Sequence, residues 1–205
     1  MIDDEMGLKV RVSEFASKRI YGESKPATKS PLYKPDRRHT MIRATTDEKF
    51  DIEIVISSKF DFKGQRYIRA KVEFDGGVRT VSKHIFNNSI RSLNGRERVF
   101  KYQFRATKGL KDGQWMYLGF AFGELKVDKD LLVSAEEEAK QAANRGTIKV
   151  TLQRGWAVRT EEENPADVNT QRIPSLKTSE KVVVQHCKTH GFKYEESNFG
   201  DEIRS

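Results

Sequence analysis

Cysteine is nearly absent from this sequence of 205 residues, in which Cys187 is the only one. A single cysteine cannot form an internal disulfide or a thiolate metal cluster. The sequence also has no run of about 18 apolar residues, so we expect no transmembrane helix and no membrane partner. Residues 1–5 are acidic and lack the apolar core of a signal peptide. We therefore expect an intracellular protein, either cytoplasmic or nuclear.

Residues with catalytic or metal-binding chemistry form no recognised pattern. His186 and His190 are four apart and would share a face of a helix, but no third ligand follows at the spacing of a zinc site. Asp51 and Glu53 alternate with apolar residues, and we interpret them as outward carboxylates in cross-strand ion pairs beside Lys49 and Lys59. No glycine loop is followed by a lysine of the Walker type. We therefore predict a non-enzymatic protein with no cofactor and no bound metal.

Positive charge is concentrated in two segments. Residues 7–45 hold ten Lys or Arg against three acidic residues, and residues 63–111 hold thirteen against three. These segments carry +7 and +10, so the net charge of +8 leaves −9 for the rest of the chain. Such segments can attract phosphates or an acidic protein surface, and they can also be the solvated outer positions of strands. We favour the second interpretation because most of the cations alternate with apolar residues.

Alternation of apolar and polar residues predicts strands along most of the chain. The clearest segments are residues 50–56, 68–74, 100–106 and 148–152, with shorter ones at 8–12 and 41–44 and an apolar, central one at 115–122. The sequence Asp75-Gly76-Gly77 predicts a hairpin turn, because glycine readily adopts positive φ angles. About eight strands at this spacing predict a mainly β fold, an antiparallel, jelly-roll-like β-sandwich.

One helix and two irregular segments interrupt the strands. Ser134 and Glu137 have the spacing of a capping box, and Gly146 marks a stop, so we predict a surface crossover helix between them. The proline-containing residues 21–38 predict a long loop. We assign residues 1–159 to the β-sandwich domain and residues 160–205 to a linker and an irregular C-terminal tail that can pack on the domain. Within that tail, the pattern over residues 178–194 fits a short helix and a strand equally well.

Several segments occur in an order that resembles an uncharacterised fungal family of domains of unknown function. These segments are residues 7–12 (GLKVRV), 39–54 (HTMIRATTDEKFDIEI), 72–77 (VEFDGG), 145–150 (RGTIKV) and 179–181 (SEK), with His186 soon after. The family has an acidic-Gly-x-x-Phe approach to a strand, and Asp47-Glu48-Lys49-Phe50 lacks its glycine. The resemblance covers nearly the whole chain. It implies a fungal source and a single compact β-sandwich, and it implies no activity.

Two functions remain for a chain with these features. The first is a non-enzymatic protein-interaction or scaffold module, for which the partner is another protein. The second is association with nucleic acid through basic strand faces. For a polyanion, the contact residues we name are Lys9, Arg11, Arg37, Arg38, Arg69, Lys71, Lys101 and Arg105. Base stacking on residues 100–104 is not expected, because Phe100, Tyr102 and Phe104 share one parity and the cations share the other.

Overall fold

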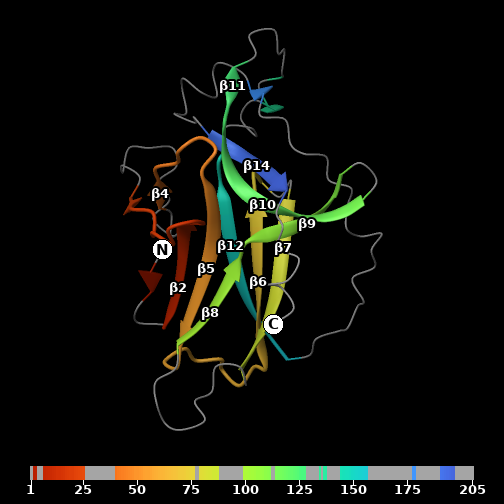
Figure 1. The fold of residues 1–205 in the computed structure, drawn as a ribbon. Helices are drawn as coiled ribbons and strands as arrows, with labels where there is room; N and C mark the ends of the chain where they lie inside the picture. The colour runs from red at the N-terminus through yellow and green to blue at the C-terminus, as the bar shows by residue number, and fades with distance from the viewer. Residues whose placement is uncertain are drawn as a thin grey trace.

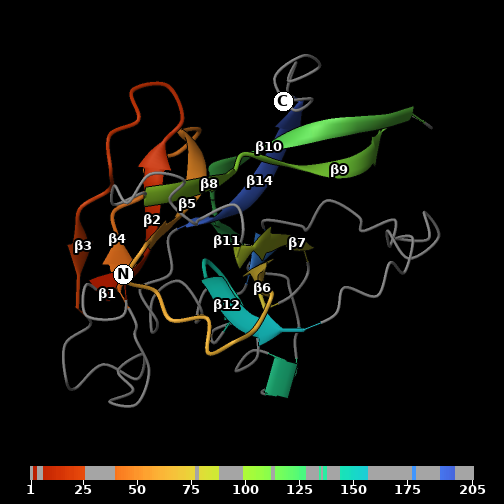
Figure 2. The same ribbon diagram turned by 90° about the horizontal axis from the view of Figure 1, so that it is seen from below.

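The structure is a computed structural model, and it describes residues 2–3, 7–25, 40–76, 79–87, 99–111, 114–127, 134, 136–137, 144–156, 177–178 and 190–196. These residues are mainly in strands, and the two principal sheets are antiparallel and lie in two layers (Figure 1, Figure 2). The prediction of a mainly β, antiparallel sandwich is therefore confirmed.

The larger sheet has the strand order β1-β2-β5-β10-β14, with β8 paired to β5 and β9 paired to β10. Its strands are β1 (Ile2–Asp3), β2 (Leu8–Glu14), β5 (Lys49–Ser57), β8 (Val99–Phe104), β9 (Ala106–Lys111), β10 (Gln114–Glu124) and β14 (His190–Glu196). The single strand expected over residues 100–106 is interrupted at Arg105. Before this residue the chain pairs with β5, and after it the chain pairs with β10. β10 then pairs with β5 through Phe120 opposite Phe50, so two strands share one edge of β5.

The smaller sheet has the order β12-β6-β7, from β6 (Tyr67–Phe74), β7 (Arg79–Phe86) and β12 (Ile148–Gly155). The predicted hairpin joins β6 to β7, and Asp75 and Gly76 have φ angles of 48° and 75°. Gly77 lies outside the described residues. Two short pairs complete the described strands: β3 (Glu23–Ser24) with β4 (Met41–Ile42), and β11 (Lys126–Val127) with β13 (Lys177–Thr178).

The core lies between the two sheets. The larger sheet contributes alternate residues of β5, and the smaller sheet contributes alternate residues of β6. These residues are Phe50, Ile52, Ile54 and Ile56 on β5 and Ile68, Ala70, Val72 and Phe74 on β6, and all are buried. The ring of Phe50 stacks on Phe122, with 4.4 Å between centroids, and lies 6.4 Å from Phe74 of the opposite sheet. The apolar parity read from the sequence therefore faces inward in both layers.

The predicted helix lies mostly outside the described residues. Its expected start is visible, because the backbone N–H of Glu137 donates a 3.2 Å hydrogen bond to Oγ of Ser134. Glu136, Glu137 and Asn144 have helical backbone. Part of the C-terminal segment belongs to the larger sheet, since β14 pairs with residues 118–124 of β10. Residues 190–194 of the ambiguous segment are thus in a strand, and residues 179–189 lie outside the described part.

Candidate functional site

Four of the cations named as polyanion contacts lie on the larger sheet. Lys9 and Lys101 are register partners of the same residue, Val55, from the two sides of β5. Arg11 is the register partner of Glu53. Arg105 lies just beyond β8, with its Nε 3.9 Å from Oδ2 of Asp51. All four alternate with residues that pack into the core, so they belong to the outer face of this sheet, the face turned away from the core.

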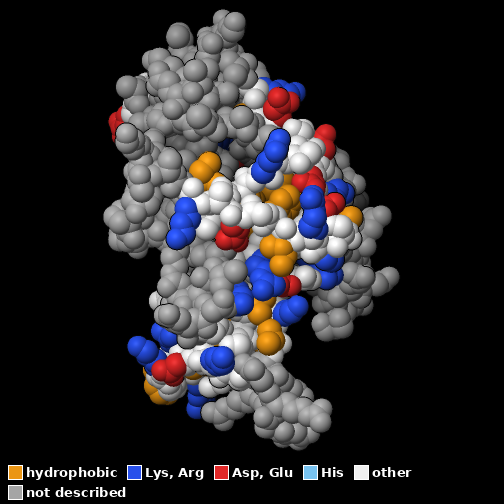
Figure 3. Space-filling view, turned by 90° about the vertical axis from the view of Figure 1, so that its left-hand side faces the viewer, with side chains coloured by type: hydrophobic (Ala, Val, Ile, Leu, Met, Phe, Trp, Pro, Cys, Tyr) orange, Lys and Arg blue, Asp and Glu red, His pale blue; other side chains and the backbone are white. Residues whose placement is uncertain are grey.

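Two further cations lie on the smaller sheet. Arg69 and Lys71 alternate with the buried Ile68, Ala70 and Val72 of β6, which places them on the outer face of that sheet. The described cations of the two basic segments are therefore divided between opposite faces of the sandwich. Figure 3 views the side of the molecule that carries β2, and there Lys and Arg side chains are interspersed with acidic and hydrophobic ones. Arg37 and Arg38 lie outside the described residues.

Several of these cations form ion pairs within the chain. Nη1 of Arg11 lies 3.6 Å from Oε1 of Glu53. Nζ of Lys71 lies 2.9 Å from Oε1 of Glu73, whose other oxygen is 3.3 Å from Nζ of Lys149. The hydrogen bond from Lys71 lowers the pKa of Glu73, so this carboxylate stays ionised. Arg69 and Lys101, in contrast, have no ion-pair partner among the residues described.

Asp51 is the most unusual ionisable group of the described part. The sequence led us to expect an outward carboxylate in an ion pair near Lys49 and Lys59. Asp51 has the outward parity, but it is 0% exposed and its ion pair is with the distant Lys18. The turn at residues 15–18 folds over this part of β5, held by a 2.9 Å hydrogen bond from the Phe15 N–H to the Lys49 carbonyl. Lys18, at a φ of 57°, then donates a 2.8 Å hydrogen bond from Nζ to Oδ2 of Asp51.

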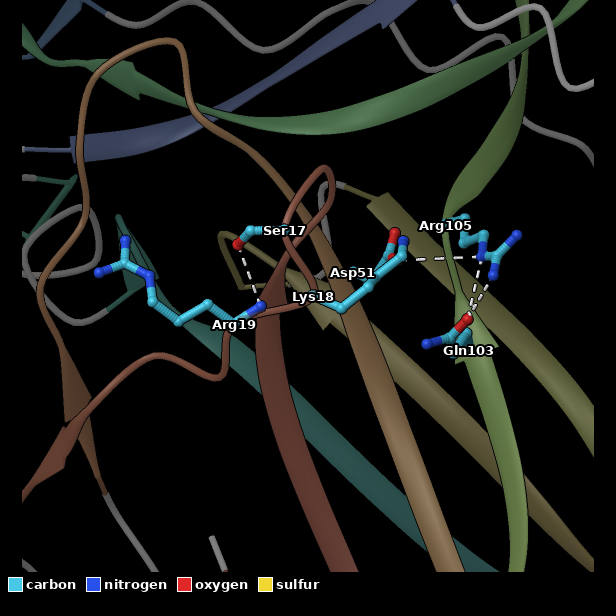
Figure 4. Close-up of polar contacts among 6 residues, drawn as sticks. All are labelled: Ser17, Lys18, Arg19, Asp51, Gln103 and Arg105. Carbon is cyan, nitrogen blue, oxygen red and sulfur yellow. Dashed lines mark hydrogen bonds and ion pairs between the residues drawn. The ribbon is translucent and has the colours of Figure 1, made fainter.

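Two cations flank Asp51 from different elements (Figure 4). Lys18 approaches from the turn after β2, and Arg105 approaches from the break between β8 and β9. Arg105 is held in place by Oε1 of Gln103, which accepts hydrogen bonds from its Nε and Nη2 at 3.1 and 2.6 Å. Burial raises the pKa of Asp51, and Lys18 and Arg105 oppose that rise. The cluster fastens the turn and the strand break to β5, which is a structural role.

Tyr21 is a second buried ionisable group. Its ring packs edge-on against Phe122 at 5.7 Å between centroids. Burial, together with the nearby carboxylate of Glu48, raises the pKa of the Tyr21 hydroxyl well above its usual range. The phenol therefore stays protonated at neutral pH and cannot act as a base there.

Large hydrophobic side chains are exposed at one end of the sandwich, which we call the β5–β6 end because residues 58–66 connect these strands there. Val99, 52% exposed, lies opposite Ser57 at the end of β5. Phe86, 42% exposed, lies opposite Tyr67 at the start of β6. Trp156, 62% exposed, follows the last residue of β12 and lies against Gly64 of the connection. The other exposed large hydrophobics of the described part, Ile20 and Met41, lie on or beside other strands.

Sequence reasoning missed two features of the described part. Tyr67 shares the outward parity of Arg69, a signal present in the sequence that becomes informative only once β7 is known to place Phe86 and His84 beside it. The ion pair between Lys18 and Asp51 carries no local signal, because 33 positions separate the two residues.

Metal-binding and membrane-spanning features were also sought in the described ranges. Within them, no three His, Cys, Asp or Glu side chains gather as they would around a metal ion. His186 and Cys187 lie outside these ranges, and only the backbone of His190 is described. None of the helical residues described belongs to a helix long and apolar enough to cross a membrane.

Comparison with known proteins identifies a family. A family model described as a domain of unknown function (DUF7918) matches residues 14–202, which is most of the chain. No curated protein and no solved structure matches the sequence. The matched range includes the smaller sheet and the larger sheet from β5 to β14, and it leaves out β1 and all of β2 except Glu14.

Proposed function

This chain belongs to the DUF7918 family of domains of unknown function, and we propose that it is a non-enzymatic protein-interaction or scaffold module that binds its partner at the β5–β6 end. The fungal origin that the sequence resemblance implies is part of this proposal, as is a cytoplasmic or nuclear location.

One observation carries the proposal: three of the five exposed large hydrophobic residues of the described part, Phe86, Val99 and Trp156, lie at the same end of the sandwich. Single exposed apolar residues are ordinary, whereas several exposed at one end of a fold favour an interaction there. Arg154 lies beside this group, with its guanidinium 5.0 Å from the ring centroid of Phe60. Tryptophan, tyrosine and arginine are enriched among the residues that dominate protein interfaces, and this end has all three.

Site-specific photo-crosslinking in a cell extract of the source organism tests the proposal. We would place p-benzoylphenylalanine at position 156 or 99 of the full chain, and at position 41 as a control. Met41 is also exposed, but it lies on β4, outside the β5–β6 end. The expected result is one reproducible protein adduct from positions 156 and 99 that is absent from position 41. No adduct, or the same adducts from all three positions, would contradict the proposal.

The second function, phosphate binding by the two basic segments together, has weaker support. It requires their cations to form one surface, whereas Lys9, Arg11 and Lys101 lie on one outer face and Arg69 and Lys71 on the other. Each face must therefore be considered separately.

A further inference from the structure

We propose that the outer face of the smaller sheet binds single-stranded nucleic acid, with bases stacked on Tyr67 and Phe86 and phosphates bound by Arg69 and Lys71. We call this surface the small-sheet face. The site goes beyond the proposed protein-binding role: it shares Phe86 with the β5–β6 end but does not depend on a protein binding there.

Aromatic and cationic side chains share this face. Tyr67 and Arg69 both point away from the core, since Ile68 between them is buried. On the neighbouring strand, Phe86 is the register partner of Tyr67, and His84 is the partner of Arg69. The ring centroid of Tyr67 lies 6.1 Å from that of Phe86 and 4.9 Å from that of His84. Three rings and one guanidinium therefore form a two-by-two block on adjacent strands.

The third strand extends this aromatic surface. Gly155 of β12 is the register partner of Tyr67 on its other side. A Cβ added at Gly155 would overlap the Tyr67 ring, so the ring lies across the backbone of β12. Phe86 remains 42% exposed on the opposite side. The rings therefore span the three strands of the sheet, and aromatic rings on an exposed sheet are the usual stacking platform for unpaired bases.

The charge of the small-sheet face suits a polyanion. Lys71 and Lys149 share the single carboxylate of Glu73, and Arg69 is exposed with no ion-pair partner among the described residues. Three cations against one anion leave a local charge of +2. The exposed neighbours Thr151 and Gln153 are neutral and polar, so they can donate hydrogen bonds to bases or sugars.

The β8 strand provides the contrast. Phe104 of β8 is buried and Phe100 and Tyr102 pack against the core, whereas Lys101 points outward. Aromatic rings and cations are thus on opposite faces of that strand, and neither face combines stacking with phosphate binding. On the small-sheet face, by contrast, both kinds of side chain lie on the same face. That combination favours a nucleic acid over an acidic protein segment, which needs the cations but not the aromatic rings.

Fluorescence anisotropy with a labelled oligo(dT) of about 12 nucleotides tests the proposal on the full chain, at about 50 mM KCl and upward. We expect saturable binding that weakens as salt rises. Phe86→Leu and Tyr67→Leu should each weaken binding by about fivefold or more, since stacking is lost while apolar volume is kept. Arg69→Gln should reduce the log–log salt slope by about 0.7, the value for one phosphate contact on a single strand.

Lys101→Gln is the matched control, because it removes an exposed, unpaired cation from the opposite face of the sandwich. It should bind like the wild type. Phe86 is exposed, so Phe86→Leu keeps the test valid even if Tyr67→Leu disturbs folding. Three results would overturn the proposal: no saturable binding at the lowest salt, unchanged affinity in Phe86→Leu, or equal losses in Lys101→Gln and Arg69→Gln. Equal competition by a polyglutamate peptide would instead assign the face to an acidic protein partner. None of these results would bear on crosslinking at positions 156 and 99.

Discussion

Replacing Lys18 with methionine measures what the ion pair with Asp51 contributes to folding, because methionine keeps the apolar stem and removes the charge. Removing one member of a buried ion pair costs about 3–5 kcal/mol when the other charge is left without compensation. Two features reduce that cost here. The Lys18 side chain is 46% exposed, so water screens the pair, and Nε of Arg105 remains 3.9 Å from the same carboxylate oxygen. We therefore expect Lys18→Met to lower the free energy of unfolding by about 2 kcal/mol at pH 7.

The pH dependence of this loss identifies its cause. Burial raises the pKa of Asp51 above that of an unfolded aspartate, so the folded state favours the protonated form. The stability associated with this carboxyl is therefore greatest below the unfolded pKa, near 3.9, and declines as pH rises through the higher folded pKa. Without Lys18 the folded pKa rises further and the decline is larger. The free energy of unfolding of Lys18→Met should thus be about 2 kcal/mol below that of the wild type at pH 7 and close to it near pH 4.

Urea unfolding at several pH values, followed by circular dichroism, is the appropriate assay. The expected 2 kcal/mol corresponds to a fall in Tm of about 4–8 °C for a protein of this size. In an Asp51→Asn background, Lys18→Met should cost less than about 1 kcal/mol, because no buried charge is left uncompensated. The reasoning fails if the cost of Lys18→Met is the same in both backgrounds, or the same at pH 4 and pH 7.

Three further substitutions test the packing. Gly155→Ala should destabilise the protein by about 1–3 kcal/mol in thermal melts, since its Cβ would overlap the Tyr67 ring, and Tyr67→Ala should recover part of this loss. Asp75→Ala should cost about 2 kcal/mol, because it removes the acceptor of the 2.7 Å hydrogen bond from the Gly146 N–H at a position with positive φ, whereas Asp75→Asn should cost less than 1 kcal/mol. Phe50→Ala should lose about 3–5 kcal/mol in urea unfolding, as this fully buried ring stacks on two others; a loss below about 1 kcal/mol would contradict the core described.

Local pattern was sufficient to predict the two strands that form the centre of the sandwich. In β5 and β6 the apolar residues fall on one parity, and that parity faces the core in both sheets. The turn at Asp75 and the cap at Ser134 were also predicted, because each depends on residues within three positions of one another.

Features that depend on distant residues were not predictable in the same way. Alternation shows that residues 100–106 are extended, but it does not specify which strand they pair with. The change of pairing partner from β5 to β10 at Arg105 therefore could not be predicted from the sequence pattern. Asp51 has the outward parity of β5 and would be exposed if the turn carrying Lys18 did not fold over it. Burial of an outward residue is a property of what covers the sheet, and that information lies elsewhere in the chain.

The positive charges on the two sheets differ in whether they compensate a carboxylate of the same chain. At the larger sheet, Arg11 compensates Glu53 and Lys18 compensates Asp51. Removing Arg11 takes this partner from Glu53, and removing Lys18 leaves Asp51 with Arg105 at 3.9 Å. On the small-sheet face, Arg69 compensates no carboxylate of the described part. Substitutions that each remove one positive charge look alike in the sequence but should therefore differ in effect. Those at Lys18 or Arg11 lower the free energy of unfolding. Arg69→Gln leaves it within about 0.5 kcal/mol of wild type and changes the affinity for a polyanion. Arg69 is therefore not needed for folding, and its charge remains available to a ligand on the small-sheet face.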